Sequence, residues 1–166
     1  MRLIFTFRAT EKVSISYLAH SHGGKNGTAY QTTSELNRNK NNMEGLLELL
    51  HYDYDSYKHP PTISLDNTFS HFGIVVPCVT RFQKRVDKLK LPILKRAGGE
   101  MTQEALEAVA KSHGLRKMWE ENKLEAESLL LMLLESIPGF SDFIFMTDPD
   151  GNLIEVQPQE LPQIPL

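Results

Sequence analysis

One segment constrains the fold of this chain most strongly: the turn sequence Asp-Pro-Asp-Gly at residues 148–151 and the apolar runs on either side of it. Proline presets one backbone angle and glycine accepts a positive φ, so these residues predict a tight turn. Residues 140–146 and 152–157 are short, apolar and rich in branched or aromatic side chains, which predicts a β-hairpin. Glu155 would then lie in a strand between branched apolar residues, where an unpaired charge is costly. It therefore needs a partner, and a metal ion is one candidate.

Composition limits the classes of function. The 166 residues are 40% hydrophobic, enough for one domain or two small packed modules with a core. The net charge of -3 argues against a nucleic-acid partner. A single cysteine, Cys78, is typical of a reducing compartment. Charges interrupt the first apolar run before a signal peptide could form, and the longest run, residues 129–134, is too short to span a bilayer. We therefore expect a soluble, cytoplasmic protein without a membrane partner.

Periodicity along the chain predicts strands, a helix and a helical region. Alternation and β-branched residues predict strands at 2–8 and 13–19, paired as a hairpin, and further strands at 43–50 and 69–76. Gly, Asn, Ser and Thr are frequent in residues 20–42, which predicts a long loop.

After Pro77 the apolar period changes to three and four residues, which predicts an amphipathic helix over 78–90, followed by a strand at 91–96. Residues 100–136 read as a second helical region broken at Gly114. The Pro-rich tail, residues 158–166, is expected to be irregular. The order of elements predicts an α+β fold.

Three residues could form a metal site. Leu-Leu-Glu-Leu at 46–49 and Leu-Ile-Glu-Val at 153–156 each place one glutamate third in an apolar strand quartet, so Glu48 and Glu155 could point into a shared cavity. His71, in the strand at 69–76, adds an imidazole. One imidazole and two carboxylates suit zinc, nickel, cobalt or manganese. Taken alone, each such residue is more often a hydrogen-bonded structural residue than a metal ligand.

The segments around these residues resemble, in order, three signature segments of glyoxalase I, a lactoylglutathione lyase of the vicinal-oxygen-chelate superfamily. They are Gly-Leu-Leu-Glu-Leu-Leu-His at 45–51, Phe-Ser-His-Phe-Gly-Ile-Val-Val-Pro at 69–77 and Asp-Pro-Asp-Gly-Asn-Leu-Ile-Glu at 148–155. The resemblance covers about residues 1–159. Glutamate rather than histidine at position 48 favours the isomerase branch over the ring-cleaving dioxygenases.

The resemblance implies a single domain of paired βαβββ modules, the glyoxalase/bleomycin resistance/dioxygenase fold, around a divalent metal, zinc or alternatively nickel. Residues 69–159 would be the second module, with a helical insert at 100–136. Residues 1–50 would be a partial first module that lacks its opening strand and helix. The family takes another metal ligand from that opening strand.

The implied reaction converts the hemithioacetal of methylglyoxal and glutathione to S-lactoylglutathione. Glu48, His71 and Glu155 would bind the metal, which stabilises an enediolate, and Glu155 would be the base that moves the proton. Lys95 matches a family lysine that contacts glutathione, whereas Tyr52 and Asn67 replace a family asparagine and arginine.

A second interpretation keeps the fold without the chemistry. In it the chain is an impaired or inactive binding protein, or a truncated product of a longer reading frame. An exposed sheet edge, left by the missing strand, would favour a homodimer in either case.

Overall fold

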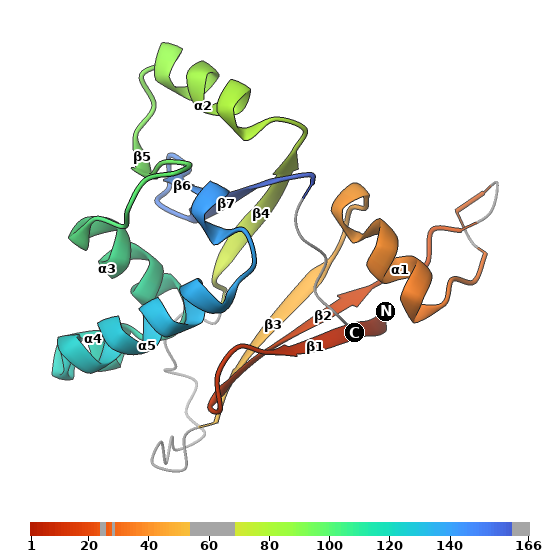
Figure 1. The fold of residues 1–166 in the computed structure, drawn as a ribbon, viewed down its shortest axis with the longest axis horizontal. Coiled ribbons are helices and arrows are strands. Elements are labelled where there is room, and N and C mark those ends of the chain that lie inside the picture. The colour runs from red at the N-terminus through yellow and green to blue at the C-terminus, as the bar shows by residue number, and fades with distance from the viewer. Residues whose placement is uncertain (24–25, 28, 54–68, 161–166) are drawn as a thin grey trace. The chain divides into compact units, whose positions relative to one another are not determined.

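The computed structural model describes residues 1–23, 26–27, 29–53 and 69–160 (Figure 1). Two compact units make up the chain: unit 1 is Met1–Tyr57 with Pro162–Leu166, and unit 2 is Lys58–Leu161. Both contain helices and strands, so the predicted α+β class is confirmed. Each unit is described by itself below.

Unit 1 contains a three-stranded antiparallel sheet. Its strands, in the order β1-β2-β3, are β1 (Arg2–Arg8), β2 (Val13–Ala19) and β3 (Leu47–Tyr52). The predicted hairpin is therefore confirmed, with both strands at the predicted residues. The third strand is also present, but it begins at Leu47 rather than at residue 43.

A helix in unit 1 corrects the prediction of a long loop. Residues Thr33–Asn39 form α1, and Lys40–Asn42 continue it as a 3₁₀ turn. Thr32 begins the helix with a capping box: its hydroxyl accepts from the Glu35 amide (3.3 Å), and its own amide donates to the Glu35 carboxylate (2.8 Å). Leu36 then packs in a buried cluster with side chains of β1 and β2. The abundance of polar residues concealed the capping sequence.

Unit 2 is built on a four-stranded mixed sheet. Its strands, in the order β4-β7-β6-β5, are β4 (His71–Val76), β7 (Leu153–Pro158), β6 (Ile144–Thr147) and β5 (Ile93–Lys95). The pair β4–β7 is parallel, and the other two pairs are antiparallel. The strand at 69–76 is thus confirmed with a later start.

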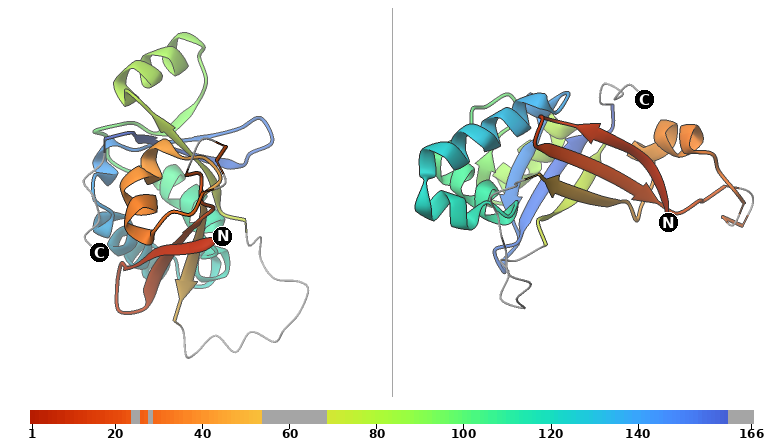
Figure 2. Two further views of the ribbon diagram at one scale, coloured as in Figure 1. Left: turned by 90° about the vertical axis from the view of Figure 1, so that its right-hand side faces the viewer. Right: turned by 90° about the horizontal axis from the view of Figure 1, so that it is seen from below.

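Helices cover both faces of this sheet (Figure 1). On one face α2 (Val79–Lys88) packs through Val79 against Ile144 and Val156, so the predicted helix is confirmed. Three further helices follow β5, namely α3 (Gln103–Ser112), α4 (Arg116–Glu121) and α5 (Lys123–Ser136). They stay together in both views of Figure 2 and are called the helical insert below. Gly114, at φ +79°, separates α3 from α4 as predicted.

The hairpin predicted from the Asp-Pro-Asp-Gly sequence is present as β6 and β7. Asp148 holds its turn, because its carboxylate accepts from the amides of Asp150 (2.9 Å) and Asn152 (2.8 Å). Gly151 has φ +87°, where a side chain would be strained. The predicted strand at 140–146 is shorter than expected, since Phe140–Asp142 form a 3₁₀ turn and β6 begins only at Ile144.

None of the helices in the described part of the chain is long and apolar enough to span a membrane.

We predict that Thr32→Ala weakens α1 by about 1 kcal/mol, because the first turn loses an acceptor for its amides. The Leu36 amide, which donates to the Thr32 carbonyl, should then exchange with deuterium about five times faster. Thr33→Ala, at the next residue, is the matched control and should leave that exchange rate unchanged or slower. Equal acceleration in both variants would contradict the capping role.

Candidate functional site

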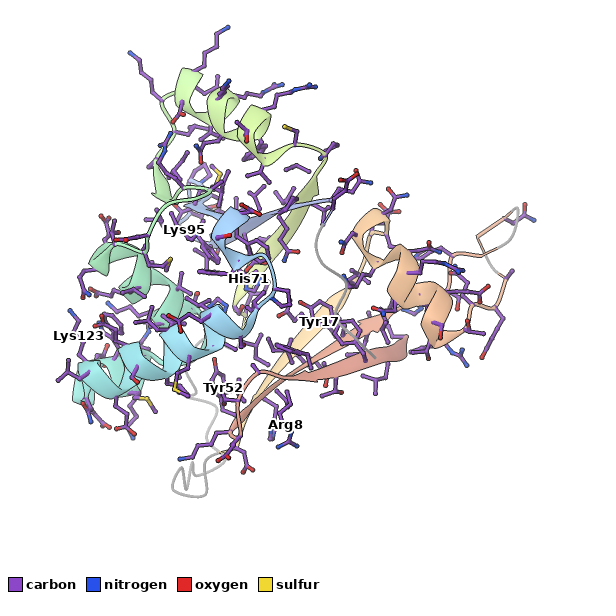
Figure 3. The ribbon with its side chains drawn as sticks, viewed as in Figure 1. Arg8, Tyr17, Tyr52, His71, Lys95 and Lys123 are labelled. Carbon is purple, nitrogen blue, oxygen red and sulfur yellow. The ribbon has the colours of Figure 1, made fainter. Side chains whose placement is uncertain are left out.

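Parallel pairing of β4 with β7 brings His71 beside Glu155. In this register His71 lies opposite Leu153, and Gly73 lies opposite Glu155. Alternate residues of a strand share a face, so His71 and Glu155 point to the same side of the sheet. The His71 Nε2 atom lies 3.8 Å from the Glu155 Oε2 atom. Figure 3 shows His71 beside β7, within unit 2.

The His71–Glu155 pair is buried, with side chains 8% and 7% exposed. Loss of hydration disfavours the charged form of each group. Burial therefore lowers the pKa of His71 to about 4. Burial also raises the pKa of Glu155 to about 7, against a smaller lowering by its hydrogen bond from Gln157. At neutral pH the imidazole is neutral, and the carboxyl group lies near its midpoint of ionisation.

The other polar atom of each side chain, Oε1 of Glu155 and Nδ1 of His71, already has a partner. The Gln157 amide donates to Glu155 Oε1, and the Ser70 hydroxyl contacts His71 Nδ1. A distance of 3.8 Å between Nε2 and Oε2 exceeds a hydrogen bond, so these two atoms do not satisfy each other. Both therefore remain able to act on a third group.

Glu48 belongs to unit 1, whereas the His71–Glu155 pair belongs to unit 2. It is half-buried on β3, directly opposite Tyr17 of β2, which stacks on Phe5 at 4.8 Å. In the described ranges no group of three His, Cys, Asp or Glu side chains that could hold a metal ion occurs. The structure thus pairs two of the three predicted ligands, and the role of Glu48 stays a prediction.

Lys95 is almost completely buried, at 2% exposure, on β5 (Figure 3). Its ammonium group, with three N–H donors, lies within hydrogen-bond distance of four backbone carbonyls, those of Phe143 (2.9 Å), Ser141 (3.0 Å), Phe140 (3.3 Å) and Arg96 (3.3 Å). Burial lowers the pKa of this lysine, and the negative charge of nearby Asp142 partly opposes that effect. The side chain thus fastens β5 to the 3₁₀ turn that precedes β6. Its predicted contact with glutathione stays a prediction.

The remaining sequence candidates are less informative. Tyr52 ends β3 opposite Val13, and Asn67 lies outside the described residues. Three other histidines, His20, His22 and His51, are exposed.

His113 is a site residue that sequence reasoning missed. It follows the last residue of α3, is 7% exposed and stacks on the His71 ring, with ring centroids 5.0 Å apart and planes 19° apart. Its pKa is lowered to about 3, mainly by burial and also by His71, while a hydrogen bond with the Val109 carbonyl acts in the opposite direction. The only local signal was a histidine directly before the helix-ending Gly114.

No protein-family model matches this chain, and a search of curated proteins finds no match to it.

We predict that Glu155→Gln becomes progressively more stable than the wild type as pH rises from 5 to 8. The raised pKa of Glu155 stabilises the fold below its ordinary pKa, and this contribution is lost as pH rises through about 7. Glutamine has no such loss, so the difference in unfolding free energy should grow by about 2 kcal/mol over this range. The lowered pKa values of His71 and His113 affect both proteins, so their effect cancels in the difference.

Fluorescence of the single tryptophan, Trp119, measures this difference during urea unfolding, because that residue is buried in unit 2. If the difference in unfolding free energy between the two proteins does not change with pH, Glu155 has the same pKa in the folded and the unfolded protein.

We predict that Lys95→Met destabilises unit 2 by roughly 2 kcal/mol or more, because buried carbonyls lose a charged donor. Lys88→Met, an exposed lysine of α2, is the matched control and should change stability by less than about 0.5 kcal/mol. Urea unfolding followed by Trp119 fluorescence tests both. Equal stability of the two variants would refute the structural role of the ammonium group.

Proposed function

We propose that this chain is a metal-dependent isomerase of the glyoxalase I type, which converts the methylglyoxal–glutathione hemithioacetal to S-lactoylglutathione. His71 and Glu155 are metal ligands, Glu155 is also its base, and the role of Glu48 as a further ligand stays a prediction from the resemblance. The observation that carries the proposal is the buried His71–Glu155 pair, whose facing atoms are too far apart for a hydrogen bond.

The topology of unit 2 supports the family assignment. The elements β4, α2, β5, β6 and β7 follow one another as strand, helix and three strands, apart from the helical insert between β5 and β6. This is the order of one βαβββ module. In unit 1, three antiparallel strands stand where the resemblance expects the last three strands of the first module.

The donor atoms of the pair fit a divalent ion such as zinc. Ligands about 2.1 Å from a tetrahedral zinc ion lie about 3.4 Å apart, only a few tenths of an ångström less than the observed 3.8 Å. His71 is neutral at pH 7 because its pKa is lowered to about 4, so it can offer a lone pair. The Ser70 hydroxyl oxygen can accept a hydrogen bond from a protonated Nδ1, and this tautomer leaves the lone pair on Nε2.

Glu155 suits proton transfer between two adjacent carbons. A base is most effective when its pKa lies near the working pH. Burial raises the pKa of Glu155 to about 7 in the metal-free chain, and a divalent ion bound beside it would lower that pKa. Its carboxylate takes the proton from the carbon that carries sulfur and returns it to the neighbouring carbon, while the hydroxyl proton moves between the two oxygens. A bound divalent metal supplies Lewis acidity toward those oxygens.

A second candidate is a protein with the same fold that binds a ligand or partner without catalysis. His113 of the helical insert lies against the His71 ring and covers this side of the sheet. Because this contact restricts access to His71, it favours the function without catalysis. In both functions we propose a homodimer, which the exposed Phe72 and Ile74 on the edge strand β4 support.

We expect close to one zinc or nickel ion per chain in protein purified without chelators. His71→Ala should lower this content severalfold or more, because the pair loses its imidazole, and His51→Ala, an exposed histidine, should not change it. Metal analysis of the folded proteins gives the content. Absence of metal from the wild type supplied with both ions would refute the metal-dependent function and leave the binding function.

Turnover separates the two candidates further. The isomerase should form the thioester from methylglyoxal and glutathione, and Glu155→Gln should reduce its rate at least a hundredfold while the protein remains folded. Normal turnover in Glu155→Gln would exclude this residue as the base. A metal-loaded wild type that forms no thioester would favour the binding protein.

A further inference from the structure

We propose that His113 of the helical insert is a positioning residue, which stacks on His71 and holds the His71 ring with Nε2 directed at Glu155. This inference deepens the proposed function and rests on it, because it concerns how tightly His71 binds a divalent ion.

The two rings form an offset stack. Their planes are 19° apart with centroids at 5.0 Å, so one ring lies over part of a face of the other. An imidazole on an edge strand can turn about its last side-chain bond, because that torsion is broad and roughly two-fold. A ring packed on one face restricts this rotation for His71, and the Ser70 hydroxyl restrains Nδ1 at its edge.

His113 is itself held firmly. Its Nδ1 atom lies 2.8 Å from the Val109 carbonyl and 2.9 Å from the Ser112 hydroxyl. A carbonyl only accepts hydrogen bonds, so Nδ1 carries the proton and donates to Val109. Its backbone caps α3, immediately before the positive-φ residue Gly114. The ring is therefore a fixed surface rather than a mobile side chain.

The insert as a whole supports this ring. α3 ends in a core of fully buried side chains that includes Val109, Leu130 and Leu133, and α3 also contacts β5 and β7. Displacing His113 would require moving α3 within that core. The insert thus contributes to the site, although it interrupts the order of a βαβββ module.

Restraint of a metal-binding imidazole by its neighbours affects metal affinity. Partners that orient a ligating histidine change affinity by about 10–100-fold when they are removed. His113 would act in the same way, with a ring face in place of a hydrogen bond. It need not touch the metal or the substrate itself.

Two variants separate the ring stack from the hydrogen bond. His113→Phe keeps an aromatic ring against His71 but cannot donate to the Val109 carbonyl. His113→Asn keeps a donor near the position of Nδ1 but has no ring. Trp119 fluorescence during urea unfolding confirms that both variants are folded at the conditions used.

We expect zinc affinity, measured by competition with a chromophoric chelator, to fall about tenfold or more in His113→Asn and to stay within about threefold of the wild type in His113→Phe. In metal-free protein, NMR relaxation of the His71 ring carbons should report faster ring motion in His113→Asn only. Equal affinity and equal ring motion in all three proteins would overturn the proposal. Equal loss in both variants would overturn it as well, because the hydrogen bond to Val109 would then be responsible.

The metal-free measurement distinguishes this proposal from the proposed function. If the wild type binds no zinc, the metal-dependent function fails, and the NMR comparison still decides whether His113 holds His71. If zinc binds and all three proteins show the same His71 motion, the function stands and the positioning role fails.

Discussion

The parallel pairing of β4 with β7 is the contact on which the rest of unit 2 depends. Parallel neighbours need a long crossover connection, and here it contains α2, two strands and the helical insert. This pairing joins residues more than eighty positions apart and sets the register that places His71 beside Glu155. Burial by the covering helices then shifts the pKa values of both groups toward their neutral forms.

In the described part of unit 2, the buried side chains of Lys95, His113, Glu155 and His71 are accommodated in different ways. Lys95 has four carbonyl acceptors, so its ammonium group is well satisfied and has a structural role. His113 donates to the Val109 carbonyl, lies beside the Ser112 hydroxyl and packs on an aromatic face. Glu155 and His71 each retain an atom that the other cannot satisfy, and this difference makes the pair, rather than the lysine, the candidate site.

Much of the fold was predictable from local patterns, and the exceptions have clear causes. Apolar alternation located β1, β2 and β4, and the three- and four-residue period located α2. Helix α1 was missed because polar composition suggested a loop, although Thr32 and Glu35 formed a recognisable capping box. The 3₁₀ turn at Phe140–Asp142 was missed because its apolar side chains resemble a strand.

Local sequence alone determined the Asp148 turn, the β6–β7 hairpin that contains it and the placement of Glu155 in a buried strand, because these depend on neighbouring residues and on strand alternation. Only the tertiary structure decided that Lys95 is enclosed by carbonyls and that His113 stacks on His71. Such contacts join residues about forty to fifty positions apart, and no local period encodes which buried side chain will face which.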